Sequence, residues 1–330
     1  MVAARFFERL SCMSPKLPSS ANPITGFRIL AAALGVVTTF AVPAYADFSV
    51  GGSFAAPGYG ARPWGMAGAA VASGADEASV YWNPAMLGLI DEHRVGLAYS
   101  NLIPGVDARQ SYVAYAQALK QGPVNEPGLE FAEHAIGAIY GNLTIELADG
   151  QFYSENTLRI SYAYSPAYFL SFGVGFAGLQ TTSDVQGFGA TGTALDASIR
   201  LGLSRAFTMA AVIRNAFSQL GFEDGRTETL PRSYTLGLAY GGVSNLVVET
   251  DVETKFGGFS KFVLGAEYNV HHDVLAVRAG LATITVGESR SIAYLGAGVQ
   301  VRRFRFDYAV DFDSDEAFEN TQRLSLGIGF

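Results

Sequence analysis

The chain has 330 residues, 49% of them hydrophobic, and its 22 Lys and Arg against 30 Asp and Glu give a formal net charge of −8. This acidic surplus argues against a nucleic-acid partner, because proteins bind nucleic acids through clustered basic side chains. The single cysteine, Cys12, excludes an internal disulfide and a cysteine-based metal centre.

Residues 1–46 have the pattern of a secretory signal peptide. Four basic residues precede an apolar run from Ile29 to Val42, and Ala44-Tyr45-Ala46 is a small-x-small cleavage site. The run is too short for a comfortable membrane span. We expect cleavage before Asp47, which leaves 18 Lys and Arg against 29 Asp and Glu, a formal charge of −11. The alternative is an anchor helix that is retained.

Residues 47–91 precede the first predicted strand, and the part from Gly60 to Leu89 fits no regular element. It lacks the alternation of a strand, and its glycines and prolines would interrupt a long helix. It also holds both tryptophans, Trp64 and Trp82.

From residue 92 to the C-terminus, apolar and polar residues alternate with period two. In the segment 303–312, for example, Arg303, Arg305 and Asp307 alternate with aromatic side chains. Segments of about ten alternating residues separated by turns predict an all-β fold, a transmembrane antiparallel β-barrel. Closure follows because lipid satisfies no backbone hydrogen-bonding group. A soluble β-sandwich also alternates, but its outer faces would carry more Lys and Glu.

We predict fourteen strands in this region. They lie near 92–101, 110–119, 132–143, 157–165, 168–179, 189–203, 206–215, 232–241, 244–255, 261–270, 273–283, 289–300, 303–312 and 321–330.

The lengths of the links predict the orientation of the barrel. Links after even-numbered strands are short, apart from the one after the second strand, whereas links after odd-numbered strands are mostly longer and more polar. Outer-membrane barrels have short periplasmic turns and longer external loops. We therefore expect a bacterial outer-membrane location with both mature termini on the periplasmic side.

The C-terminal strand resembles the signal that the barrel assembly machinery recognises in its clients. It alternates and ends in a phenylalanine, and the residues that carry the resemblance are Leu324, Leu326, Ile328 and Phe330.

Strand charges fall on the face opposite the aliphatic and aromatic residues. We assign that face to the lumen, because Arg or Lys at the lipid midplane costs about 2–4 kcal/mol. The predicted lumen charges are Arg200, Arg214, Glu249, Asp251, Glu253, Arg303, Arg305 and Asp307.

Fourteen strands behind an N-terminal segment resemble the layout of FadL-type fatty-acid transporters. The segment 60–89 is also similar to a motif that this family shares with its PorV/PorQ-type relatives, with Met86 standing where the family has glycine. The rest of the chain resembles the family only in architecture. The residues that carry the likeness are Gly60, Arg62, Gly65, Met66, Gly68, Asp76, Tyr81, Trp82, Asn83, Pro84 and Ala85.

The resemblance implies that residues 47–91 form a plug inside the barrel of residues 92–330, with Asn83-Pro84-Ala85 tied to gating. A plug is also expected physically, because a barrel of this size is too wide for its own side chains to fill. We expect Arg62 and Asp76 to pair with wall charges such as Glu249, Asp251, Arg303 and Arg305. In the simpler interpretation these charges only hold the plug in place.

The expected function is passive uptake or binding of hydrophobic small molecules, fatty-acid-like or aromatic. The ligand would leave through the lumen or through the wall, and the glycine-rich stretch Ser171–Gly178 would permit a kinked strand there. The alternative is a PorV/PorQ-type component that conducts nothing and binds secreted cargo proteins. Outer-membrane lipid is an expected partner in both cases.

Catalysis is not expected. The histidines at 93, 134, 271 and 272 lack the carboxylate or serine spacing of a hydrolytic site, and no metalloprotease, nucleophile-elbow or phosphate-loop motif is present. We predict no cofactor and no metal.

Overall fold

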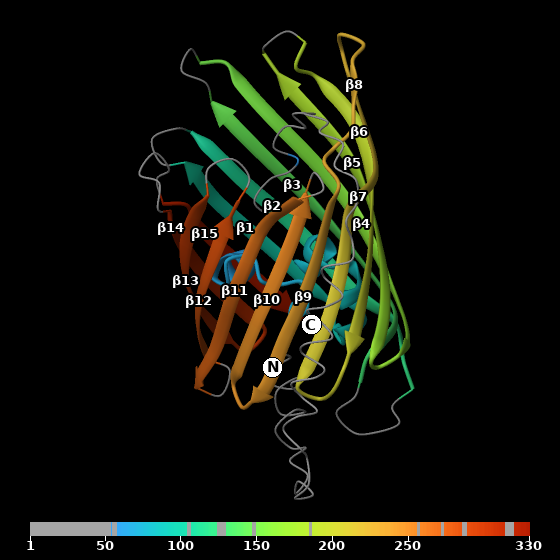
Figure 1. Ribbon diagram of the computed structural model, residues 1–330, viewed down its shortest axis with the longest axis vertical. Helices are drawn as coiled ribbons and strands as arrows, with labels where there is room; N and C mark the ends of the chain where they lie inside the picture. Colours follow the sequence, from blue (N-terminus) through green and yellow to red (C-terminus); the bar gives the residue numbers. More distant parts are fainter. Residues whose placement is uncertain are drawn as a thin grey trace, which may run out of the picture.

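The computed structural model is a closed antiparallel barrel of fourteen strands (Figure 1). It describes residue 54 and residues 58–103, 107–123, 130–146, 150–184, 187–255, 258–271, 274–285, 289–313 and 320–330. The predicted signal peptide lies outside the described residues, as does most of 47–57.

The fourteen strands of the barrel follow one another along the chain. They are β1 (Arg94–Ile103), β2 (Ala108–Gln121), β3 (Ala132–Glu146), β4 (Phe152–Ala167), β5 (Leu170–Ser183), β6 (Ala190–Gly202), β7 (Phe207–Phe222), β9 (Ser233–Val243), β10 (Leu246–Lys255), β11 (Gly258–His271), β12 (Leu275–Ile284), β13 (Arg290–Val301), β14 (Phe304–Asp313) and β15 (Gln322–Gly329).

Each strand pairs antiparallel with the next, and β1 pairs with β15 to close the ring, with Arg94 opposite Gly329. The two-residue strand β8 (Thr227–Glu228) pairs only with the end of β7. The fourteen predicted strands are therefore confirmed. Several run further than the alternation suggested; β7, for example, continues to Phe222 because a bulge after Ile213 interrupts the alternation without ending the strand.

The two ends of the barrel differ. We call the end that holds the turns 168–169, 203–206, 244–245 and 302–303 the short-turn end, and the opposite end, with the links 223–232 and 314–321, the long-loop end. Residue 93 and Phe330 meet at the short-turn end through two backbone hydrogen bonds of 3.0 Å.

Outward and inward positions alternate as the sequence predicts. On β5, Phe172, Val174 and Phe176 are 44–54% exposed on the outer face, whereas Ser171 and Ala177 are buried towards the lumen. Apolar side chains thus form the surface that lipid would contact.

Residues 58–91, which we call the plug, occupy the lumen (Figure 1, blue to cyan). The plug contains two short α-helices, α3 (Ala61–Gly65) and α4 (Ser79–Trp82), and the 3-10 helix η2 (Pro84–Leu89). No helix in the described part of the chain is both long and apolar enough to span a membrane. Helix α3 contacts β12–β15, and η2 contacts β2–β6, so the plug touches most of the wall.

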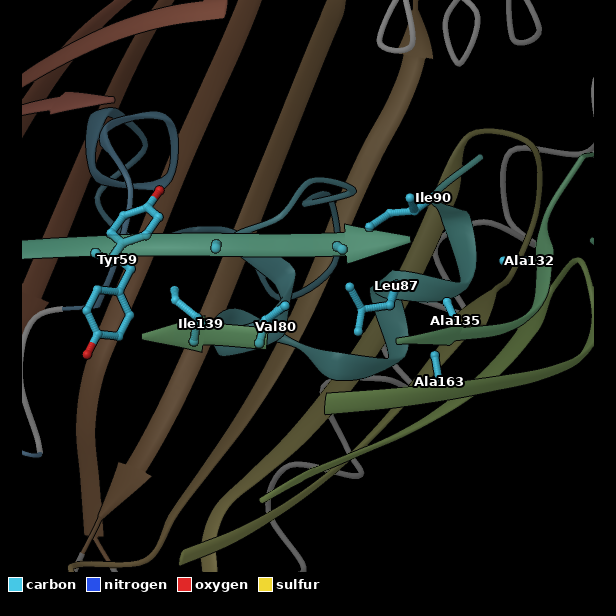
Figure 2. Close-up of a cluster of buried hydrophobic side chains, with 11 residues drawn as sticks. Tyr59, Val80, Leu87, Ile90, Ala132, Ala135, Ile139 and Ala163 are labelled. Carbon is cyan, nitrogen blue, oxygen red and sulfur yellow. The ribbon is translucent and has the colours of Figure 1, made fainter. Parts of the chain in front are cut away.

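Apolar packing fixes the η2 side of the plug. Figure 2 shows Leu87 beside the wall alanines Ala135 and Ala163, and Val80 beside Ile139, and all five side chains are buried. Small wall residues bring the strand backbone close to the plug.

Glycines of the wall make the closest contacts with the α3 side. Gly265 and Gly280 are direct partners across β11 and β12, and both lie beneath Met66. A Cβ added at Gly265 would approach the Met66 carbonyl oxygen at 2.6 Å, and one at Gly280 would approach the Met66 carbonyl carbon at 2.5 Å. The plug therefore fits the wall too closely for any larger residue there.

The irregular strand is β7 rather than β5. We expected Ser171–Gly178 to permit a kink, but β5 keeps an unbroken register with β6 over that stretch and with β4 from Phe172 onwards. In β7, a bulge places residues 214–216 opposite Asp196 alone, and Asn215 adopts a positive φ of 52°. The bulge turns both Arg214 and Asn215 inwards.

We predict that Gly265→Ala destabilises the folded barrel by about 1–3 kcal/mol, because the new methyl group overpacks against the plug backbone. The heat-induced mobility shift of the purified protein in gel electrophoresis measures this as a lower unfolding temperature. The control is Gly178→Ala, where the nearest atom to the new Cβ is 3.9 Å away. Equal unfolding temperatures for the two variants would contradict the close fit.

Candidate functional site

Asn83 ties two parts of the plug together. Its Nδ2 donates to the Val71 carbonyl at 2.6 Å, and its Oδ1 accepts from the Ala85 amide at 2.9 Å, which caps η2. The Ala85 amide also donates to Ser198 Oγ of β6 at 3.0 Å. Asn83 is fully buried, and so is Met86, which lies in η2. The Asn-Pro-Ala motif is thus a structural junction between the plug and the wall.

Aromatic side chains gather on the side of the plug that faces the long-loop end. Tyr59 and Trp82 each contact Tyr81 edge-to-face at centroid distances of 4.9 and 5.3 Å, and Trp82 Nε1 donates to the Tyr59 carbonyl at 2.8 Å. The Arg214 guanidinium lies 4.1 Å from the centroid of the Tyr81 ring and donates to the Tyr81 carbonyl at 2.8 Å. The bulge in β7 supplies this arginine, so the irregular strand serves the plug.

Asp196 organises the wall beside this cluster. Its carboxylate pairs with Arg159 of β4, lies 3.6 Å from Arg214, and accepts from the Asn215 amide at 2.8 Å. The last bond satisfies a backbone donor that the bulge removes from the ladder.

The opposite side of the plug is joined to β11, β12 and β14 by a closed circuit of charges. From the plug, Arg62 lies 3.5 Å from Asp76 and 2.9 Å from Glu267 of β11. Asp76 lies 3.4 Å from Arg305 of β14, which also lies 3.1 Å from Glu77.

Two wall residues complete the circuit. Arg278 of β12 lies 2.5 Å from Glu267 and 2.8 Å from Asp307, and Asp307 lies 2.9 Å from Arg305. All side chains involved are at most 20% exposed. We call this set the ion-pair ring; its members are Arg62, Asp76, Glu77, Glu267, Arg278, Arg305 and Asp307.

The partners of the plug charges differ in part from those we expected. Arg305 does pair with Asp76, but Glu249 and Asp251 instead accept from the backbone amides of Ala72 and Ala70, at 2.5 and 3.3 Å. Arg303 lies beside Arg302 in the turn between β13 and β14. The main partner of Arg62, Glu267, was not among our candidates, although it lies at an inward position of its strand.

The remaining predicted residues are distributed over the lumen and the rim. Arg200 is buried and donates to the Tyr168 carbonyl at 2.9 Å, and Glu253 pairs with Lys255 at 3.1 Å. Gly60 and Gly68 have positive φ, and Gly65 packs on Gly296. On β15 the side chain of Leu324 is exposed on the outer face, Leu326 and Ile328 continue the strand, and Phe330 stacks on His93 at 5.5 Å.

A cavity of about 480 Å³ opens below the plug at the short-turn end. The plug residues Ala72, Ser73 and Ala75 line it together with the ion-pair ring, and Arg302 and Arg303 lie at its rim. We call it the lower cavity.

The lumen above the plug has a different lining. On β5–β7 the inward side chains form an apolar cluster that includes Leu179, Leu220 and the nearby Leu230, with Phe54 packed against it. A pocket of about 20 Å³ lies between this cluster and Tyr59 and Tyr81, and polar wall residues, among them Glu155 and Arg159, also line it. We call this region the upper chamber. Among the described residues, no group of three or more His, Cys, Asp or Glu could hold a metal ion.

We predict that Asn83→Ala destabilises the protein by about 1–3 kcal/mol, because it leaves the Val71 carbonyl and the Ala85 amide with fewer buried partners. Thermal unfolding of the purified protein measures the change. Asn101→Ala, at an exposed position of β1, is the control and should unfold like the unsubstituted protein. If Asn83→Ala matched this control, Asn83 would not be the junction we describe.

No protein-family model matches the chain, and no curated protein sequence matches it. Several solved structures, however, match its fold. CymD, a monoaromatic hydrocarbon channel, aligns with a TM-score of 0.62 at 13% identity, over 83% of this chain and 98% of CymD.

The P. putida toluene transporter TodX aligns with a TM-score of 0.63 at 14% identity, over 83% of this chain and 99% of TodX. A Pseudomonas aeruginosa FadL homologue aligns with a TM-score of 0.59 at 12% identity, over 83% and 98% of the two chains. The resemblance to FadL-type proteins is thus confirmed at the level of the fold, over almost their whole length.

Proposed function

We propose that this protein is an outer-membrane barrel for the passive uptake or binding of hydrophobic small molecules, with monoaromatic hydrocarbons as the first class to test. The fold it shares with hydrocarbon channels supports this proposal. The apolar outer surface supports a position in a lipid bilayer.

The observation that carries the proposal is the apolar cluster at inward positions of β5–β7 in the upper chamber. Barrels that conduct water and polar solutes have polar interiors. Here Leu179 and Leu220 are 6% and 2% exposed at inward positions of the wall, where a water-filled channel would have polar side chains. Apolar surface inside a lumen favours a ligand that is itself apolar, at about 25 cal/mol per Å² removed from water.

The aromatic cluster on the plug would form the floor of the binding site. Tyr59 and Tyr81 line the pocket below the leucines, and their rings are held edge-to-face at 4.9 Å. Aromatic rings favour the same offset and edge-to-face contacts with an aromatic ligand. A ligand in the upper chamber would therefore meet leucine side chains on the wall and tyrosine rings below.

We place the short-turn end in the periplasm. Four of its turns have only two to four residues, and both the chain entering β1 and the end of β15 lie there. Short periplasmic turns are typical of outer-membrane barrels. The upper chamber then faces outwards and the lower cavity faces the periplasm, and the C-terminal strand from Leu324 to Phe330 is available to the assembly machinery.

We predict that Leu179→Gln lowers the uptake of radiolabelled toluene by cells to less than about a third, because burying an amide in the chamber costs about 1–3 kcal/mol. Leu179→Met, which keeps the site apolar and nearly the same size, is the matched control and should retain uptake. Equal uptake by both variants at equal surface expression would contradict the proposed site.

The alternative function, a non-conducting component that binds secreted cargo, predicts a different outcome. A deletion strain would then take up fatty acids and aromatic hydrocarbons at the normal rate, and protein cargo would co-purify with the barrel. Unchanged uptake in the deletion strain, with no lipid retained by the purified protein, would refute the uptake proposal.

A further inference from the structure

The plug has a thin segment over the lower cavity. Residues 72–77 read Ala-Ser-Gly-Ala-Asp-Glu, and all of them except Gly74 line that cavity. We call these six residues the roof segment. Its first four residues are small, so the plug is thin at this point above the cavity.

The roof segment is attached to the wall at its two ends. At the start, the Ala72 amide donates to Glu249 at 2.5 Å. At the end, Asp76 and Glu77 lie 3.4 and 3.1 Å from Arg305. Between these points, Gly74 O accepts from Ser79 Oγ of the plug, and among the described residues no hydrogen bond joins Ser73–Ala75 to the wall.

Arg305 makes the attachment at the second end. Asp76 keeps a second cation, Arg62, at 3.5 Å, whereas the ion pair described for Glu77 is with Arg305. Glu77 is 2% exposed, so without Arg305 its carboxylate would be buried beside that of Asp76, and the cation left near it, Arg94, has its described ion pair with Glu92. A buried carboxylate that loses its partner is strongly destabilised and gains by moving into water. The space beside Glu77 is the lower cavity, which is large enough for water and which Glu77 helps to line.

The parts of the plug before and after the roof segment are held differently. Val80 and Leu87 lie in one buried apolar cluster with Ala135 and Ala163, and Ser161 Oγ donates to the Val80 carbonyl at 2.9 Å. Trp64 and Met66 lie in a second buried apolar cluster with residues of β11–β14. Apolar packing of this kind changes little when charges rearrange. The roof segment therefore depends on ion pairs at its Asp76–Glu77 end, whereas the parts of the plug on either side of it are held by close packing.

From this arrangement we propose that the roof segment is a gate, that the ion pairs of Arg305 with Asp76 and Glu77 are its latch, and that its release opens an aqueous path for ions and small polar solutes. The path would run past Ser73 into the lower cavity. This activity is separate from the uptake of hydrophobic ligands and does not rest on it.

The test is the conductance of purified protein in planar lipid bilayers in KCl. Arg305→Gln should raise the open probability at least about a hundredfold over the unsubstituted protein, as expected when a buried ion pair is broken. Arg303→Gln is the matched control, because Arg303 lies on the same cavity two residues earlier, and among the described residues no ion pair joins it to the plug. It should stay closed.

Two further variants make the test specific. Glu77→Gln breaks one of the two ion pairs of the latch and leaves no carboxylate unpaired, so it should open the channel more often than the unsubstituted protein and less often than Arg305→Gln, which covers the case that Arg305→Gln does not fold. Ser73→Cys combined with Arg305→Gln should lose conductance when a charged thiol reagent is added, while Arg305→Gln alone should not respond, because the chain's only cysteine is Cys12 of the predicted leader.

Folded Arg305→Gln or Glu77→Gln protein that stays closed would overturn the latch. Conductance that rises equally in Arg303→Gln would also overturn it, because charge loss anywhere in the cavity would then suffice. Open channels that the reagent does not block at residue 73 would overturn the assignment of the roof segment as the gate. None of these results depends on whether hydrocarbons are taken up.

Discussion

The plug has to fill a lumen that the wall cannot fill. Strands exposed to lipid must satisfy every backbone group, so the sheet closes on itself, and fourteen strands enclose more space than their inward side chains occupy. The chain solves this by folding residues 58–91 inside the ring and by keeping the wall small where the plug touches it. The glycines at 265 and 280 are consequences of that fit.

Two kinds of interaction hold the plug. Towards β2–β4 the contact is apolar and closely packed, whereas towards β11–β14 a similar apolar contact is joined by a circuit of ion pairs. The two spaces also differ. The lower cavity at the short-turn end is charged, whereas the upper chamber at the long-loop end has a leucine cluster and tyrosine rings beside polar wall residues such as Arg159. A single plug thus separates a cavity lined by ion pairs from a chamber that offers apolar and aromatic surface.

Period-two alternation predicted all fourteen strands because inward and outward residues of a barrel differ in polarity at every step. It also placed Arg305 and Asp307 on the lumen face. Alternation does not predict which inward charges lie at the same height along the barrel axis, since that depends on the register of strands far apart in the chain. For this reason Glu267, in β11, was missed as the partner of Arg62, and Glu249 was expected in its place.

Local irregularities were harder to predict than strands. Glycine content suggested a bent β5, but its glycine at 173 instead makes room for the plug backbone at residues 84 and 85. The bulge lies in β7, where Asn215 carries the positive φ. Asparagine tolerates that conformation, yet the reason for the bulge lies outside its own strand, in the contacts of Arg214 with the plug and of Asn215 with Asp196.

The most direct test of the account is the position of a bound hydrophobic ligand. A crystal structure of the protein soaked with 4-bromotoluene would locate the bromine by its anomalous scattering. We predict bromine density in the upper chamber, between Leu179 and Leu220 on the wall and Tyr59 on the plug. Bromine found only on the outer surface of the barrel, with the chamber unoccupied at saturating ligand, would contradict a binding site inside the lumen.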